Sequence, residues 1–214
     1  LAASAICMTL TATAFATDVF INEIHYDNAS TDTGEAIEIA GPAGTDVTDW
    51  SLVLYNGNGG GSYGTPTTLS GALSDQQNSF GTLSVPVPGM QNGVEAISLV
   101  SSTNEVVQFL SYEGAFVAND GAAIGLKSID IGISESSSTR SDQSMQLTGT
   151  GSKYDDFVWT KNLTNSAGLS NINQFIVTQG KEVSRVSEPA TGFLLVIALL
   201  FITWLKKLYV VKVI

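Results

Sequence analysis

Apolar and polar residues alternate along several short runs of this chain, and clusters of glycine, asparagine and aspartate separate the runs. Alternation with period two is typical of strands with one buried face, and no stretch between the two ends shows an apolar stripe at helical spacing. Seven strands are expected, at residues 19–26, 36–40, 50–55, 95–100, 105–112, 144–147 and 157–160. The pattern therefore predicts an all-β fold, an immunoglobulin-like antiparallel β-sandwich.

The alternation also predicts which side chains face the core. It places Phe20, Ile24 and Tyr26 on one face of the first strand, and it leaves Glu38 on the outside of the second. Residues 56–64 (NGNGGGSYG) are rich in glycine but lack the Lys-Ser/Thr pair of a phosphate-binding loop. We expect a turn between two strands there rather than a nucleotide site.

The N-terminal run has the features of an export signal. Residues 1–16 carry no charge and place Ala14 and Ala16 at the −3 and −1 positions of a cleavage site. Because the chain begins at Leu1 without Met or a basic region, we expect this signal peptide to be N-terminally truncated. A buried N-terminal helix is the alternative. The only cysteine, Cys7, lies in this run, so the mature domain is expected to have neither disulfides nor thiolate metal sites.

The C-terminal run predicts a short transmembrane helix with a basic tail, residues 192–214. Its uncharged part, residues 192–205 (GFLLVIALLFITWL), would span about 21 Å as a helix, so flanking residues are needed to cross a bilayer. Lys206 and Lys207 flank the membrane on the far side of this run. The positive-inside rule places the two lysines in the cytoplasm and the β domain beyond the inner membrane.

Just before this helix stands a short motif of Ser187, Glu188, Pro189, Ala190 and Thr191. Followed by an apolar helix and a basic cluster, it resembles the PEP-CTERM sorting signal of Gram-negative bacteria, although Ser187 replaces the first proline and seven residues follow the lysine pair. The resemblance implies processing by an exosortase-like enzyme at the inner membrane. It also implies display at the cell surface or in an extracellular matrix, among extracellular polysaccharide or surface proteins. A plain membrane anchor without sorting is the alternative.

Four blocks in the middle of the chain resemble the lamin-tail-type domain that accompanies nuclease domains in secreted bacterial nucleases. The blocks are residues 21–28 (INEIHYDN), 34–60, 108–114 (QFLSYEG) and 145–159. The similarity covers about residues 18–175 and implies an immunoglobulin-like sandwich. It does not imply nuclease chemistry, because the catalytic domain of those enzymes is a separate region. The expected organisation is a signal peptide at 1–16, the β-sandwich at 17–177, a linker with the sorting motif at 178–191, and the helix and tail at 192–214.

The charge of the expected domain is strongly acidic. Residues 17–179 contain eighteen Asp and Glu against four Lys and Arg, and the whole chain has a net charge of −11. Nucleic-acid affinity comes largely from basic side chains that displace counterions from phosphates. Direct nucleic-acid binding is therefore disfavoured.

Groups suited to catalysis are few. The only histidine, His25, lies on the first strand beside Glu23, and alternation points both away from the Phe20–Ile24 face, so His25 is expected to be a surface histidine. The domain has a single histidine and no cysteine, so it offers few ways to assemble the common catalytic triads. We therefore expect a protein that is not an enzyme.

The loop after the first strand offers the best candidate for metal chemistry. Hard oxygen donors suited to Ca²⁺ occur there at Asp27, Asn28, Asp32 and Glu35. An Asx-rich turn without metal is the alternative. The sequence thus predicts a non-catalytic exported surface or matrix protein with a β-sandwich binding or structural module and no cofactor beyond this candidate calcium. The alternative is a nuclease accessory module or the remnant of an extracellular nuclease.

Overall fold

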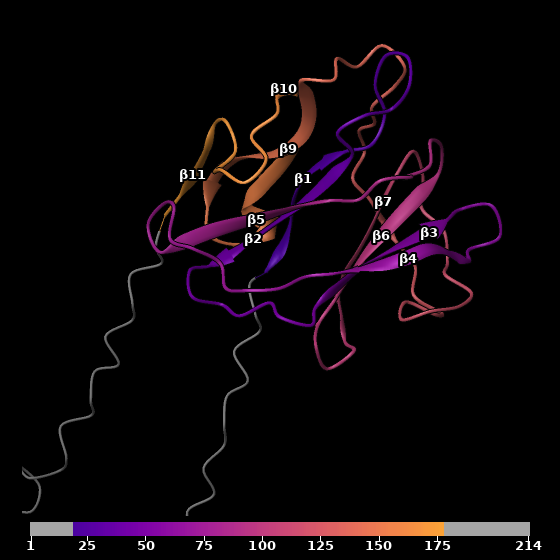
Figure 1. Cartoon of the computed structure of the whole chain (residues 1–214), viewed down its shortest axis with the longest axis horizontal. Coiled ribbons are helices and arrows are strands. Elements are labelled where there is room, and N and C mark those ends of the chain that lie inside the picture. The colour runs from indigo at the N-terminus through magenta and orange to yellow at the C-terminus, as the bar shows by residue number, and fades with distance from the viewer. Residues whose placement is uncertain (1–18, 178–214) are drawn as a thin grey trace, which may run out of the picture. The chain divides into compact units, whose positions relative to one another are not determined.

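The computed structural model describes residues 19–177, which form a sandwich of two β-sheets (Figure 1). The expected signal peptide, sorting motif (Ser187 to Thr191), C-terminal helix and flanking Lys206 and Lys207 lie outside the described residues. Within residues 19–177, no helix has the length and apolar character needed to cross a membrane. The all-β prediction is confirmed for this part of the chain.

The first sheet has six strands and contains both ends of the described chain. Its order is β10 (Phe157–Thr164), β9 (Gln143–Gly151), β1 (Phe20–His25), β2 (Ala36–Pro42) and β5 (Phe80–Pro86). The short strand β11 (Gln174–Ile176) runs parallel to β9 beside this path. Strand β5 is an edge strand and ends at Pro86, a residue that cannot donate a backbone hydrogen bond to a neighbouring strand.

The second sheet has five strands. Its order is β4 (Ser62–Thr68), β3 (Ser51–Asn56), β6 (Glu95–Val100), β7 (Val106–Tyr112) and β8 (Ile129–Asp130). A single 3₁₀ turn, η1 (Tyr154–Asp156), precedes β10. All seven predicted strands are present, and the glycine-rich segment is the β3–β4 hairpin, as expected. The ladders are antiparallel except for β7 with β8 and β9 with β11, which are parallel.

A β-bulge in β1 changes which of its residues face the core. The register against β2 shifts between Ile21 and Glu23, so Ile21 joins Ile24 in the core between the sheets. Phe20 lies on the opposite face and packs with Ala40 and the aromatic residues of a separate cluster. The prediction that Phe20 shares a face with Ile24 is therefore wrong, because strict alternation does not allow for an extra residue.

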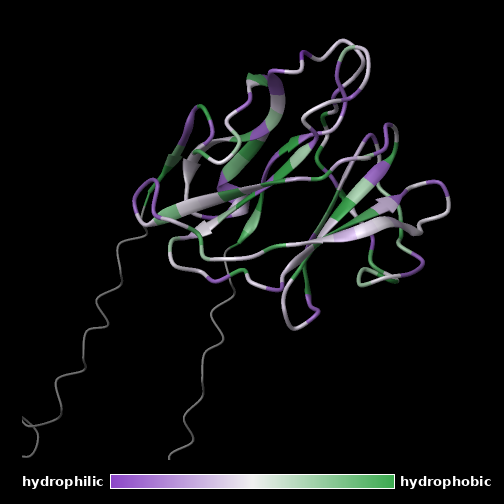
Figure 2. Ribbon diagram, in the orientation of Figure 1, coloured by the Kyte–Doolittle hydropathy of each residue, from purple (hydrophilic) through white to green (hydrophobic). Residues whose placement is uncertain are grey.

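The core between the sheets consists mainly of isoleucine, leucine and valine side chains. Figure 2 shows that apolar residues line the strands of both sheets. Completely or almost completely buried members include Ile24, Ile37, Leu52, Leu99 and Tyr112. Each such side chain contributes about 1.5–3 kcal/mol relative to an exposed one. This core holds the two sheets together without any disulfide in the described residues.

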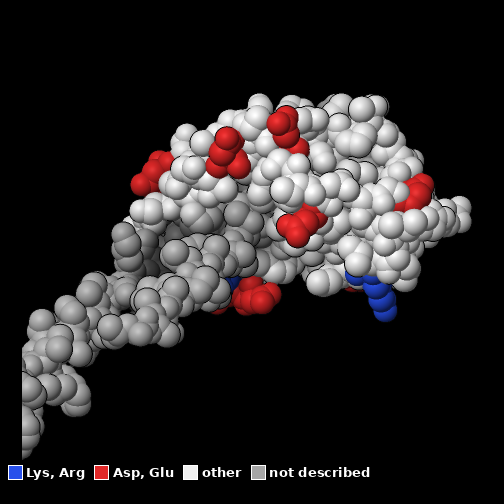
Figure 3. Space-filling view, turned by 90° about the horizontal axis from the view of Figure 1, so that it is seen from below, with Lys and Arg blue, Asp and Glu red and all other residues white. Residues whose placement is uncertain are grey.

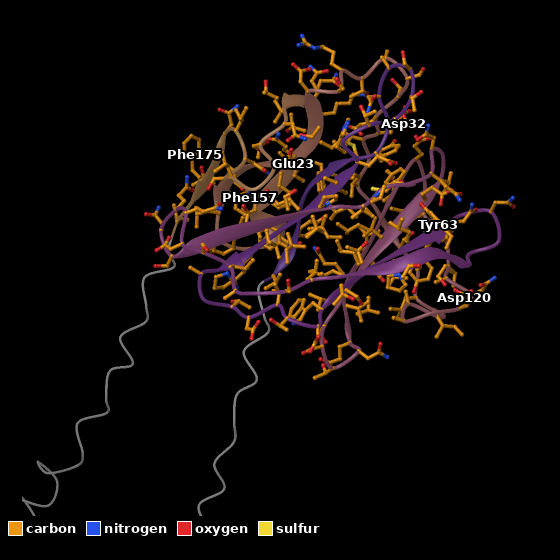
Figure 4. The ribbon with its side chains drawn as sticks, in the orientation of Figure 1. Glu23, Asp32, Tyr63, Asp120, Phe157 and Phe175 are labelled. Carbon is orange, nitrogen blue, oxygen red and sulfur yellow. The ribbon has the colours of Figure 1, made fainter. Side chains whose placement is uncertain are left out.

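The outer face of the first sheet is covered by residues 165–177, here called the C-terminal clasp. Ser166 donates to Glu23 through its backbone N–H (3.1 Å) and its hydroxyl (2.7 Å). The N–H of Gly168 donates to Glu38 (2.6 Å). Asn171 donates to the carbonyl of Asn22 (2.9 Å). Figure 4 labels Glu23, which lies on β1 beside β9.

The clasp explains why two carboxylates that point away from the core are nevertheless buried. Glu38, expected outside, is 1% exposed, and Glu23 is 3% exposed. Both carboxylates do point to the outer face of the sheet, but the clasp removes that face from water. Burial raises the pKa of Glu38 to about 8, and the nearby charge of Glu23 adds to the rise.

Candidate binding site at the loop end of the sandwich

Four loop segments meet at one end of the sandwich and are tied to each other by acidic side chains. Glu35 accepts from the N–H of Gly89 (2.7 Å), and Asp32 accepts from the side chain of Asn92 (3.4 Å). These bonds join residues 26–35, which connect β1 with β2, to residues 87–94, which connect β5 with β6. The segments after β7 and before β9 join them through Glu113 and Glu135. We call this region the loop end; Figure 4 labels Asp32 within it.

Glu135 is the centre of a buried hydrogen-bond network at the loop end. Its Oε1 lies 2.9 Å from Nδ1 of His25, and its Oε2 accepts from the N–H groups of Tyr26 (2.6 Å) and Asp27 (3.0 Å). The backbone N–H of Glu135 donates to the hydroxyl of Tyr26 (3.0 Å). The carboxylate thus closes the end of β1 with charge-assisted bonds.

His25 is a buried residue, contrary to the prediction of a surface histidine. It is 1% exposed, and Nε2 lies 3.2 Å from the carbonyl oxygen of Thr33. Burial disfavours the charged imidazolium, but the hydrogen bond and charge of Glu135 outweigh it, so the pKa of His25 is raised. The error has a physical cause: alternation shows that His25 faces away from the core, while the segment that contains Glu135 covers it from a distant part of the chain.

The two tyrosines at this end are stacked. The ring centroids of Tyr26 and Tyr112 are 3.9 Å apart, and the Tyr26 hydroxyl donates to Glu113 (2.8 Å). Burial raises the pKa of both phenols, and the charge of Glu113 contributes to each rise. The phenols therefore stay neutral and act as hydrogen-bond donors and packing surface rather than as bases.

The four candidate calcium ligands lie at the loop end, and the side chains of Asn28, Asp32 and Glu35 form hydrogen bonds within the protein. The backbone N–H of Asn28 donates to the side chain of Asp32 (3.1 Å), a bond that ties the two ends of this short segment together. The side-chain nitrogen of Asn28 donates to the carbonyl of Thr33 (2.9 Å). Burial and the neighbouring Asp32 raise the pKa of Asp27. In residues 19–177 no group of three or more acidic, histidine or cysteine residues has a metal-binding arrangement, and calcium binding stays a prediction.

Beside these loops lies a cavity of about 590 Å³. It opens between the β3–β4 hairpin, the loop before β6 and the segment after β7, with Asn56, Gln91, Val94, Glu95 and Phe116 among its lining residues. Glu95, the first residue of β6, is 4% exposed, and its Oε2 has no hydrogen-bond partner among the described residues. A buried carboxylate oxygen without a partner is uncommon in folded proteins and calls for an explanation.

The charged form of Glu95 is disfavoured at this position. Burial raises its pKa to about 7, and the charge of Glu113 contributes. Its directly opposed neighbour on β7 is Tyr112, and on β3 it is Asn56. Glu95 therefore lies at the end of the core face of the second sheet, where the core meets the cavity.

Sequence reasoning missed Glu95, Glu113 and Glu135 as site residues. A signal was present for Glu95: it stands in a predicted strand in phase with Ile97 and Leu99, so alternation places a carboxylate on the buried face. Glu135 gave no local signal, because its partners lie more than one hundred positions away in the sequence.

No family model, curated protein or solved structure matches this chain. The fold is therefore shown as a β-sandwich of two sheets without a family. The likeness to lamin-tail domains and to the PEP-CTERM signal rests on the residues given above.

Proposed function

We propose that this chain is a non-catalytic exported surface or matrix protein, whose lamin-tail-like, immunoglobulin-like sandwich serves as a binding or structural module. In this proposal the C-terminal tail sorts or anchors the protein after export. The support comes from both ends of the sequence, which have the features of a signal peptide and of a sorting signal, and from the compact sandwich between them. An exosortase-like enzyme and the inner membrane are its proposed partners during export.

The observation that carries the non-catalytic part is the state of His25. Both of its ring nitrogens face oxygen atoms of the protein, and the side chain is almost completely buried. A general base must reach the proton that it removes. His25 cannot do so without breaking the network around Glu135, which supports a structural role for the only histidine of the chain.

The surface charge supports the same choice over a nucleic-acid function. Figure 3 shows acidic side chains spread over one face of the domain, with few basic ones. A polyanionic backbone gains little from such a surface. A nuclease accessory module, the alternative class, would need a basic groove or a metal bridge to bind its substrate.

We expect the full chain to cleave neither DNA nor RNA in the presence of Mg²⁺, Mn²⁺ or Ca²⁺, because the only histidine is buried and held in structural hydrogen bonds. A gel assay of plasmid DNA and ribosomal RNA measures this, with a gel shift, with and without Ca²⁺, as the test of binding. Metal-dependent cleavage that a point substitution in residues 19–177 abolishes would show that the proposal is wrong.

We expect the surface form to end upstream of Gly192, because the Ser187–Thr191 motif is the proposed recognition site for processing. Mass spectrometry of C-terminal peptides from the cell-surface fraction measures the end of the chain. The matched variant Pro189→Ala should accumulate in the inner membrane with its tail intact. A wild-type surface protein that retains the peptide ending at Ile214 would contradict sorting and favour the plain anchor.

A further inference from the structure

The cavity beside the loop end has walls that are held in place before any ligand arrives. The N–H of Gln91 donates to the hydroxyl of Tyr63 (3.0 Å), and the hydroxyl of Tyr112 donates to the carbonyl of Gln91 (2.9 Å). On the other side, the N–H of Gly57 donates to the carbonyl of Val94 (2.8 Å). Figure 4 labels Tyr63 on β4 near this wall. Little ordering is then needed on binding, which favours affinity.

Several polar atoms of the cavity lining are left without partners within the described part of the chain. The side chain of Asn58, the amide nitrogen of Gln91 and the amide oxygen of Asn92 form no hydrogen bond there, although other atoms of Gln91 and Asn92 do. The Oε2 atom of Glu95 is likewise without a partner. The lining therefore offers solvent-exposed amide donors and acceptors together with one buried carboxylate acceptor.

This mixture selects the chemistry of the ligand. A metal ion binds acceptors only and an inorganic anion binds donors only, whereas a hydroxyl group both donates and accepts. Val94, 40% exposed, and the half-buried Phe116 add an apolar wall for carbon-bound hydrogens. Glu95 and the neighbouring Glu113 disfavour uronate, sulfate or phosphate groups at this site.

From these observations we infer that the cavity lined by Asn58, Gln91, Asn92, Val94, Glu95 and Phe116 is a binding site for a neutral, hydroxyl-rich saccharide unit. The Glu95 carboxylate and the Asn92 oxygen accept from sugar hydroxyls, and the Asn58 and Gln91 amides donate to them. The apolar face of the ring lies against Phe116. This inference deepens the proposed binding module and rests on it.

The pKa of Glu95, which is near 7, fits this role. In the free protein the carboxylate is poorly solvated and has no partner for one of its oxygen atoms. A hydroxyl donor from the ligand supplies the missing partner. Binding is therefore expected to strengthen as pH rises from 6 to 8, because the ionised form is the better acceptor.

The test uses the full chain on an array of neutral oligosaccharides, followed by titration calorimetry with the strongest one. Glu95→Ala and Asn58→Ala should each weaken binding about tenfold, the effect of losing roughly one good hydrogen bond. The matched variant Glu105→Ala removes an exposed carboxylate from the opposite end of β6–β7 and should leave affinity unchanged. Melting temperatures should not fall in Glu95→Ala, since the lost Oε2 atom has no partner in the folded domain.

Three other outcomes of the binding test would overturn the proposed site. Saccharide binding that survives both pocket substitutions places the ligand elsewhere and leaves the proposed function intact. Absence of binding to every neutral saccharide, by a folded protein, rejects the ligand class. Binding that requires Ca²⁺, or that prefers acidic saccharides, rejects the neutral-ligand chemistry. Nuclease activity would overturn the proposed function alone, because it does not bear on the cavity.

Discussion

Replacing Glu135 with alanine is expected to lower the free energy of unfolding by about 3–5 kcal/mol, the usual effect of removing one partner of a buried charged network. The side chain accepts from His25, Tyr26 and Asp27, and all three donors would be left buried without a partner. Thermal unfolding of the full chain, followed by circular dichroism, measures the change. A fall of about 10 °C in melting temperature is expected for a domain of this size.

Two variants separate the network from a general effect of losing a carboxylate. Glu105→Ala makes the same substitution at an exposed position and should change the melting temperature by about 1 °C or less. Glu135→Gln should be milder than the alanine variant. Its amide nitrogen can donate to Nδ1 of a neutral His25, whose Nε2–H then donates to the carbonyl of Thr33. If Glu135→Ala melts within 2 °C of the wild type, the network does not contribute to stability as described.

The strands were predictable from the sequence because each of the seven carries its own periodic signal. Ile37 and Ile39 face the core for the reason that alternation gives, and both are fully buried. The bulge in β1 was not predictable, because one extra residue in a run of six leaves no mark in composition. Strand β5 was missed because Gly81 occupies a core-facing position, which leaves only Leu83 and Val85 as an apolar pattern on that face.

The outer face of the first sheet shows a more general limit of predicting burial from the alternation of residues. Alternation correctly turned Glu23, Glu38 and His25 away from the core, but polar residues on an outer face look alike whether water or protein covers them. The covering residues, the C-terminal clasp and Glu135, lie more than one hundred positions away in the sequence. Burial of these groups is a property of the fold and not of the local sequence.

The candidate site also has one part that could be predicted from the sequence and one part that could not. The loop with Asp27, Asn28, Asp32 and Glu35 was recognisable because its donors are consecutive or nearly so in the chain. The cavity was not, because the hairpin, the loop before β6 and the segment after β7 supply it jointly. Only Glu95 gave a sequence signal, as a carboxylate in phase with buried aliphatic residues.

Raising the pH from 5 to 9 is expected to lower the melting temperature of the full chain by about 10 °C, on the scale of several degrees per kcal/mol. The folded pKa of Glu38 is about 8 and that of Glu95 is about 7, both above the ordinary value near 4.5. Between the ordinary pKa near 4.5 and the raised pKa of each group, the folded state binds more protons than the unfolded state. The free energy of unfolding therefore falls as pH rises through this range. The pKa of His25 is also raised, and its contribution is lost as pH rises through that value. The decline should begin near pH 4.5 and level off above pH 8.

The double variant Glu38→Gln, Glu95→Gln should remove most of this decline, because the amides do not ionise and occupy nearly the same volume. Its melting temperature should change little between pH 5 and 9, and at pH 9 it should exceed that of the wild type. Glu105→Gln, an exposed matched change, should keep the wild-type slope. Equal slopes in the double variant and the wild type would assign the decline to other groups. If the double substitution instead removes the decline, then burial of Glu38 by the clasp and of the unpartnered oxygen of Glu95 makes the domain most stable in mildly acidic surroundings.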